Sequence, residues 1–325
     1  MVEPVLGIVA VTWRRRILVL VGGGCFAGAL LLAAGAPSFL VLLLAFSLLY
    51  PASGAFVSLS QASLMDLQPE RREVNMAHWT LAGAIGAVAG PLLLAGFAWA
   101  TLGWRGLFAA LALVALVLVW RSRAAAVDDG HGERLQVRDA LRVLGRRDVF
   151  RWLFLLELSD LMLDVFLGFI ALYLVDEVGA SPAAGGVAVA VWTGAALVGS
   201  ALSIPMLQRV DGLRYLRISA VLAAGLFVAF LVVPGLAAKL ACAAALAVVN
   251  AGWYPVLKAR LYGALGNASG LMLTVGALFP LNVVLPLALA GLAERWGLDA
   301  ALWILLAAPM ALLVLVPRRL ASPNT

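Results

Sequence analysis

Ten long apolar stretches dominate the sequence, and each is long enough to cross a lipid bilayer as a helix. They cover residues 17–36, 38–60, 76–101, 105–120, 150–174, 183–207, 216–235, 236–257, 270–293 and 299–317. A bilayer core about 30 Å thick needs roughly 20 apolar residues of helix. With 64% hydrophobic and only 12% charged residues, the chain has too little polar surface for a soluble fold. The stretches lack the alternation of barrel strands. We therefore predict an all-α, polytopic helical membrane protein with about ten transmembrane helices.

The basic residues between these stretches predict the orientation of the chain. Alternate connections hold 20 of the 23 Lys and Arg residues, and the opposite connections hold Arg105, Lys239 and Arg295. Basic residues gather on the cytoplasmic side of membrane proteins. We therefore expect a multi-pass protein of the plasma membrane (bacterial inner membrane) with a cytoplasmic C-terminus. The net charge of +6 reflects this topology, and no nucleic-acid partner is needed to explain it.

An internal repeat with an offset of about 200 residues divides the chain. Residues 91–98 recur at 286–293, Tyr50-Pro51 recurs as Tyr254-Pro255, and arginine clusters precede the first and seventh spans. We predict an N-terminal half-bundle of four spans (1–121), a cytoplasmic linker (122–149) and a C-terminal six-helix half-bundle (150–325). An amphipathic helix in the linker either lies at the lipid headgroups or is a solvated connection. Because only thirteen residues precede Arg14, we expect a first half about 45 residues short of its repeat.

Local motifs in this arrangement resemble those of the major facilitator superfamily. Residues 7–10 followed by Arg14–Arg16 are similar to that family's loop between its second and third helices, without its acidic residue. The segment from Gly86 through Gly90 to Pro91 is similar to part of the fifth-helix motif of its antiporters, and Gly103-Trp104-Arg105 also matches the family. The resemblance implies a secondary transporter working by alternating access, without its first one to two helices. The fourth-helix Arg motif of proton-coupled members has no match between Ser38 and Ser60.

Three acidic residues lie inside the fifth span, where ionisable groups are costly and therefore suggest function. Glu157, Asp160 and Asp164 share one helical face at about 100° per residue. Asp164 lies deepest, about 20 Å along the helix from Arg151, and is the best candidate. Carboxylates in a wet central cavity can exchange protons or attract a cationic substrate. Glu157 and Asp160 could instead pair with cytoplasmic arginines.

Two further spans carry polar or aromatic stripes that could line a substrate cavity. The second span offers Ser47 and the cavity candidates Tyr50, Gly54, Ser58 and Gln61; the eighth offers Asn250, Trp253 and Tyr254. Such groups either face a cavity or hydrogen-bond between helices. Lys258 follows Tyr254 by four residues and is expected to anchor the cytoplasmic end. Gly86, Gly90 and Pro91 are read as a helix-packing motif because small residues let helices approach.

The sequence disfavours an enzyme, because it shows no catalytic grouping, nucleotide motif or metal-ligand spacing. No cofactor and no metal site are expected. We predict a secondary transporter of a small-molecule substrate, with the lipid bilayer as its surroundings, protons as the coupling ion and a monomeric state. The preferred activity is efflux of an amphipathic or drug-like compound. Uptake of a metabolite and a non-transporting truncated remnant are the alternatives.

Overall fold

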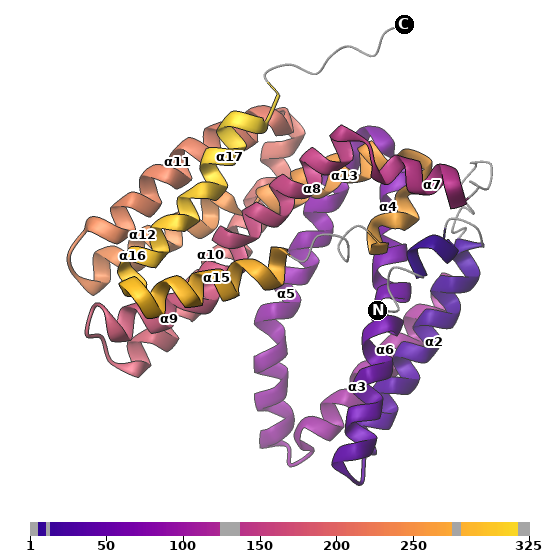
Figure 1. Ribbon diagram of the computed structural model, residues 1–325. Helices are drawn as coiled ribbons and strands as arrows, with labels where there is room; N and C mark the ends of the chain where they lie inside the picture. The colour runs from indigo at the N-terminus through magenta and orange to yellow at the C-terminus, as the bar shows by residue number, and fades with distance from the viewer. Residues whose placement is uncertain (1–5, 11–13, 124–136, 275–280, 318–325) are drawn as a thin grey trace, which may run out of the picture. The chain divides into compact units, whose positions relative to one another are not determined.

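The computed structural model describes residues 6–10, 14–123, 137–274 and 281–317, which form helices and short connections without a strand (Figure 1). Nine helical segments of this part are long and apolar enough to cross a membrane. They are Arg15–Ala34, Phe39–Leu67, Pro69–Trp99, Gly103–Ser122, Arg147–Asp176, Pro182–Arg209, Gly212–Val232, Leu236–Thr274 and Leu298–Leu315. The predicted span 270–293 includes residues 275–280, which lie outside the described residues; its described end belongs to α15 (Leu281–Trp296). The prediction of an all-α, roughly ten-helix membrane protein is confirmed.

By their contacts, the residues form two compact units. Unit 1 comprises Met1–Arg72, Gly86–Val149 and Tyr262–Leu278, and unit 2 comprises Glu73–Ile85, Phe150–Leu261 and Phe279–Thr325. The main division falls between Val149 and Phe150. Each unit also contains one short segment from the other half of the sequence.

Unit 1 is built around α2, which packs against α3, α6 and the π-helical turn η1. Its elements are α2 (Arg15–Ala34), α3 (Phe39–Ser53), η1 (Gly54–Ser58), α4 (Leu59–Leu67), η2 (Pro69–Arg71), the later part of α5 (Arg72–Trp99), α6 (Gly103–Ser122) and α7 (Val137–Leu144). A Cβ at Gly22 would overlap Ala55, and one at Gly23 would overlap Phe56. Glycine in α2 therefore makes room for the wider π turn. The α7 helix matches the predicted linker helix.

Unit 2 is built around α10, α11 and α12, which form one connected group of packed helices. Within it, α10 (Pro182–Arg209) packs against α9 (Phe166–Asp176) and α12 (Leu236–Asn250), and α11 (Gly212–Val232) packs against α12 and α17 (Ala307–Leu315). Its other elements are the early part of α5, most of α8 (Arg147–Asp160), the π-helical turn η3 (Leu161–Val165), the first part of α13 (Trp253–Leu265), α15, α16 (Leu298–Leu302) and η5 (Trp303–Leu306). The end of α13 and η4 (Gly266–Leu271) belong to unit 1. Phe166 contacts the rings of Phe227 and Phe230 at centroid distances of 5.4 and 5.1 Å. This aromatic group joins α9 to α11.

The element starts reveal the internal repeat directly. Helix α11 begins 197 residues after α2, and the same offset separates α12 from α3 and η4 from η2. Helix α16 begins 195 residues after α6. The offset agrees with that of the repeated segment 91–98. It does not fit Tyr50-Pro51 and Tyr254-Pro255, because Tyr50 lies 11 residues after the start of α3 and Tyr254 lies 18 after that of α12. The pairing of these two Tyr-Pro dipeptides was therefore wrong.

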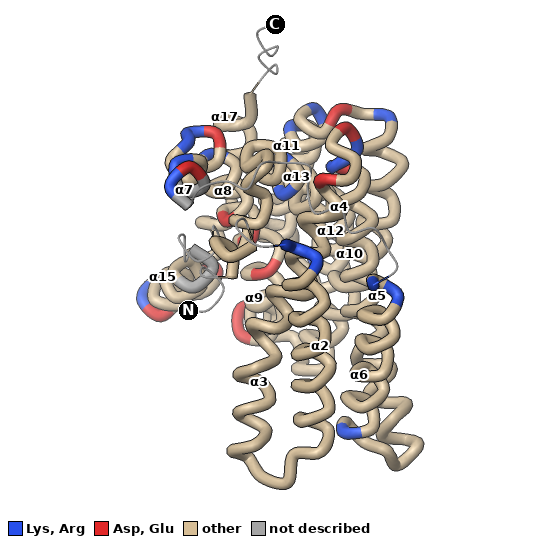
Figure 2. Tube along the Cα trace, turned by 90° about the vertical axis from the view of Figure 1, so that its right-hand side faces the viewer, with Lys and Arg blue, Asp and Glu red and all other residues tan. Residues whose placement is uncertain are grey.

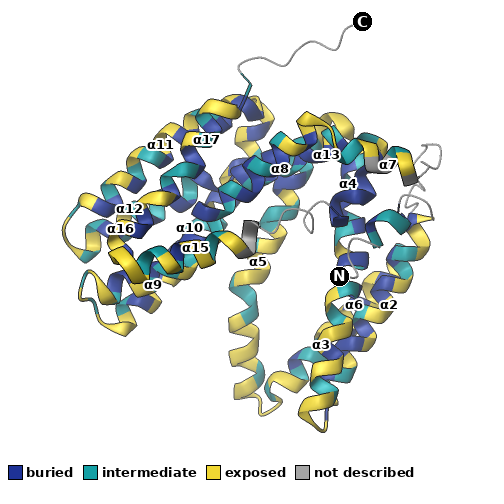
Figure 3. Cartoon of the chain, viewed as in Figure 1, coloured by how far each residue is buried: buried dark blue, intermediate teal, exposed yellow. Residues whose placement is uncertain are grey.

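Charge and burial follow the pattern expected of a chain surrounded by lipid. The body of α3 carries no charge, and the charges of α2 lie at its start (Figure 2). Many apolar side chains remain exposed on α3, α5 and α6 (Figure 3); Leu92 is 68% and Trp99 90% exposed. In a bilayer such surfaces contact acyl chains, and the backbone is satisfied within the helices.

Candidate functional site

The three acidic candidates of the fifth span lie before and inside a π-helical turn. Glu157 and Asp160 belong to α8, whose last residue is Asp160, whereas Asp164 belongs to η3. Glu157 is buried, Asp160 is half-buried and Asp164 is exposed. The helix then continues as α9 toward Asp176. The sequence-based placement of the three residues on one membrane helix therefore holds in unit 2, with increasing exposure from Glu157 to Asp164.

The π turn interrupts the regular backbone hydrogen bonding of the helix next to Asp160. Its hydrogen bonds run from i to i+5, and such turns occur often at functional sites. Asn250 at the end of α12 is 1% exposed, and its Nδ2 donates to the Met162 carbonyl inside the turn at 3.4 Å. A buried carbonyl that leaves the regular ladder needs such a donor. Asn250 thus supports the backbone between Asp160 and Asp164.

Lys258 of α13 interacts electrostatically with one of the acidic residues. From the sequence we expected Lys258 only to anchor the cytoplasmic end. The Asp160 carboxylate interacts electrostatically with Asp164, Glu157 and Lys258. The Lys258 Nζ also lies 5.6 Å from the centroid of the half-buried Tyr254 ring. The spacing of four residues from Asn250 to Tyr254 and again to Lys258 was a usable signal, because it places them on one helical face.

We call this set the acidic site: Glu157, Asp160, Asp164, Asn250, Tyr254 and Lys258. It is formed within unit 2 by α8, η3, the end of α12 and α13. The third aromatic candidate, Trp253, lies elsewhere: it is fully buried, and its Nε1 donates to Ser219 Oγ on α11 at 2.8 Å. The structure therefore brings Asn250 to the π turn that contains Asp164, places Tyr254 beside Lys258, and directs Trp253 into the packing of α11.

The residues of the polar stripe in the second span lie in different environments. Tyr50 is 66% exposed, Gly54 is buried, and Ser58 is half-buried in η1. Gln61 is 6% exposed and accepts a 2.9 Å hydrogen bond from the fully buried Tyr262 hydroxyl. Pro51 lacks an N–H and interrupts the helical ladder shortly before η1. Gln61 therefore bonds between helices of unit 1, and cavity lining by this stripe stays a prediction.

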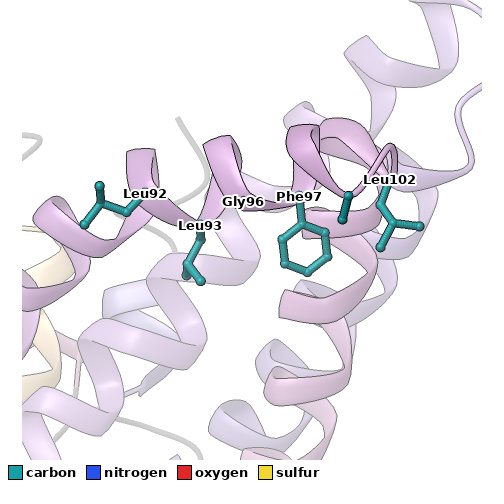
Figure 4. A pocket seen from close by; sticks show the side chains of 6 residues that line it. Leu92, Leu93, Gly96, Phe97 and Leu102 are labelled. Atoms are coloured by element: carbon teal, nitrogen blue, oxygen red, sulfur yellow. The ribbon is translucent and has the colours of Figure 1, made fainter.

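The glycine motif of α5 lies on an open surface of unit 1. Gly86 and Pro91 are exposed and Gly90 is half-buried, and a Cβ on either glycine would meet no described atom within 4 Å. Farther along the helix, an apolar pocket of about 250 Å³ lies at the turn into α6 (Figure 4). It is lined by Leu92, Leu93, Gly96, Phe97, Ala100 and Leu102. Helix packing by the motif stays a prediction.

The comparison with protein families decides what kind of protein carries this site. The family model described as the Major Facilitator Superfamily matches residues 1–281. The chain belongs to the major facilitator superfamily. It is therefore a secondary transporter that works by alternating access, and not an enzyme. No curated protein sequence matches the chain.

Solved transporters of the superfamily share the fold at low sequence identity. FucP in the outward conformation aligns with a TM-score of 0.78 and 12% identity, covering 97% of this chain and 86% of that chain. A bacterial homologue of the iron transporter ferroportin aligns with 0.67 and 19%, covering 97% and 85%. The proton:xylose symporter XylE aligns with 0.69 and 15%, covering 96% and 83%. At such identities the likeness shows a common fold and leaves the substrate open.

Proposed function

We propose that this superfamily member couples proton movement to the export of a small amphipathic or drug-like compound, as a monomer in a bacterial inner membrane. The observation that carries the proposal is the acidic site. The Asp160 carboxylate interacts electrostatically with Glu157, Asp164 and Lys258 next to a π turn of a membrane helix. When all four groups are ionised, the negative charge exceeds the positive charge. Binding of a proton or of a cationic substrate reduces this excess, and this gives the two ligands a common site.

The residues of the acidic site have distinct roles in this proposal. Asp164 is the exposed carboxylate and exchanges the proton with water. Asp160 interacts with both Asp164 and Lys258, so it senses whether Asp164 carries a charge. Tyr254 offers a ring face next to Lys258, and an aromatic face also attracts organic cations. Alternating access then exposes the loaded site to each side of the membrane in turn.

The orientation and the direction of transport rest on the sequence. The excess of basic residues in alternate connections places those connections and the C-terminus in the cytoplasm. The partial antiporter motif at Gly86, Gly90 and Pro91 favours exchange of a proton for substrate. Uptake is the second candidate: FucP is described as a fucose:proton symporter and XylE as a proton:xylose symporter. Both candidates require proton coupling, and they differ in the sign of substrate flux.

Gradient-driven flux in liposomes tests the proposal. The full chain is reconstituted into liposomes that contain DNA and an acidic lumen, with ethidium as the amphipathic cationic probe outside. Export by proton exchange predicts that ethidium enters the acidic lumen, seen as a rise in fluorescence that a protonophore abolishes. Protein-free liposomes are the control. Ethidium entry without dependence on the gradient, or no entry, contradicts the proposal; movement of a sugar probe out of the acidic lumen with protons favours uptake.

A further inference from the structure

Two residues, Ala251 and Gly252, separate α12 from α13 in unit 2. Both helices belong to one long apolar segment of the chain. Asn250, which supports the π turn, is the last residue of α12, and Lys258 follows in α13. The break between the two helices therefore lies between residues of the acidic site, and its geometry determines where Lys258 lies relative to Asp160.

A single side chain of α11, that of Tyr215, meets the backbone at this break. Its hydroxyl donates to the Val249 carbonyl at 3.0 Å and accepts from the Gly252 N–H at 3.2 Å. In an uninterrupted α-helix the Val249 carbonyl would accept from the N–H of residue 253, and the Gly252 N–H would donate to the carbonyl of residue 248. The Tyr215 hydroxyl therefore serves two backbone groups at the break, and Tyr215 is only 5% exposed.

Close packing fixes Tyr215 and its neighbour Ser219 against the break. A Cβ at Gly252 would overlap the Tyr215 ring and hydroxyl, so glycine lets the two approach. One turn farther along α11, Ser219 Oγ donates to the Tyr215 carbonyl and accepts from Trp253 Nε1, both at 2.8 Å. Trp253, the first residue of α13, is fully buried. Helix α11 therefore holds the end of α12 through Tyr215 and the start of α13 through Ser219.

The other contacts of the break come from α10 and η3. A Cβ at Gly199 of α10 would overlap the backbone of Val248, so α10 approaches the end of α12 closely. Asn250 Nδ2 donates to the Met162 carbonyl of η3. The break is therefore held by three different elements of unit 2.

We propose that Tyr215 is a positioning residue of the acidic site, whose hydroxyl fixes the break so that Lys258 faces Asp160. The inference rests on the proposed function of that site. Lys258 lies five residues after the start of α13, so a change of helix direction at the break would displace its ammonium group. The Asp160 carboxylate interacts with Lys258, Glu157 and Asp164, and this displacement would leave it beside two carboxylates. Phenylalanine would keep the ring of Tyr215 and remove both hydrogen bonds.

The labelling rate of a thiol at position 258 tests this placement without depending on transport. The full chain carries Lys258→Cys together with Cys25→Ser and Cys242→Ser, and reacts with N-ethylmaleimide in detergent. The thiolate is the reactive form, and a neighbouring carboxylate opposes its formation. Tyr215→Phe should raise the labelling rate about 3- to 10-fold, because the thiol moves away from Asp160. An unchanged rate in folded Tyr215→Phe would overturn the inference.

Tyr262→Phe is the matched control for this experiment. Tyr262 is fully buried farther along α13, and its hydroxyl donates to Gln61 at 2.9 Å, so this variant also loses a buried hydroxyl. It should leave the labelling rate unchanged, and an equal rise would overturn the inference because lost stability alone would explain it. If Tyr215→Phe does not fold, Ser219→Ala removes the other contact from α11 and should raise the rate; no rise would then overturn the inference.

The pH dependence of ethidium flux separates positioning from a merely structural role. Lys258→Met keeps the apolar stem, removes the ammonium group and should shift the pH of half-maximal flux. Tyr215→Phe should shift it in the same direction, and the double variant should shift it no further than Lys258→Met alone. Additive shifts, or no shift in Tyr215→Phe, would overturn the inference. Gradient-independent flux of the unaltered chain would contradict the proposed function only, and the labelling rates would then decide the inference.

Discussion

The Lys239 ammonium group donates a hydrogen bond to the Tyr173 hydroxyl, with Nζ and Oη 3.0 Å apart. The same group donates to the carbonyls of Phe230 and Leu231 at 2.6 and 3.1 Å. Its three N–H donors therefore have three acceptors, and it lies over the rings of Tyr173 and Phe230. Both carbonyls belong to the last turn of α11. Lys239 thus caps α11 and ties it to α9, the helix that continues from the acidic site.

Replacing Lys239 should destabilise unit 2 through this cap. Lys239→Met keeps the length of the apolar stem and removes all three donors, leaving two buried carbonyls without their partner. We expect a loss of about 2–4 kcal/mol in the free energy of unfolding, measured by equilibrium denaturation in mixed detergent micelles. Arg295→Met, at an exposed residue of α15, is the control and should change little. An equal effect of the two variants would show that the cap does not stabilise α11.

Gly212 has to lack a side chain because the Glu73 carboxylate lies against it. Gly212→Ala should cost about 1–3 kcal/mol by forcing the two apart. The same substitution in a Glu73→Ala background should cost little, because the overlapping group is gone. Gly225→Ala, at an open position of the same helix, is the matched control and should be neutral or slightly stabilising. Equal costs of Gly212→Ala in both backgrounds, measured by thermal unfolding, would contradict the contact.

Replacing Asn250 should reduce transport, because Asn250 supports the π turn next to Asp160. Asn250→Ala removes the donor of the Met162 carbonyl, so we expect η3 to lose its fixed geometry between Asp160 and Asp164. Proton-driven ethidium flux should fall about 10-fold, corresponding to about 1.4 kcal/mol, while the protein remains folded. Thr193→Ala, at an exposed side chain of α10 bonded to its own helix, is the control. Full flux in Asn250→Ala would show that the turn does not depend on this hydrogen bond.

The membrane helices could be predicted from the sequence, because lipid imposes one solution on a run of about 20 apolar residues. The three acids of the fifth span could be found for the same reason, since charge in such a run is rare. The repeat could be found from residues 91–98, whereas the chance recurrence of one Tyr-Pro dipeptide misled at Tyr50-Pro51. The element starts define the offset better than single dipeptides do, because several pairs of elements give 195 or 197 residues.

The partners of the charged residues could not be predicted in the same way. Arg15 contacts Asp66 and Ser269, which are 51 and 254 residues away, and no local pattern encodes such distances. The arginine cluster at 14–16 predicted topology, yet Arg15 is buried in an ion cluster. The π turns were also missed, because the residues of η1 and η3 read as ordinary helix. Trp253 was predicted to line a cavity, because the sequence does not show that its Nε1 donates a hydrogen bond to Ser219 of α11.

The central claim is that Asp164 exchanges the transported proton. Asp164→Asn keeps the size of the side chain and removes its proton exchange, so proton-driven ethidium flux into acidic liposomes should fall to the level of protein-free liposomes, with normal membrane insertion. Asp176→Asn makes the same change at an exposed position on the same continuous helix and should leave the flux intact. Undiminished flux in Asp164→Asn, beside an intact Asp176→Asn control, would contradict the claim and remove Asp164 from the transport site.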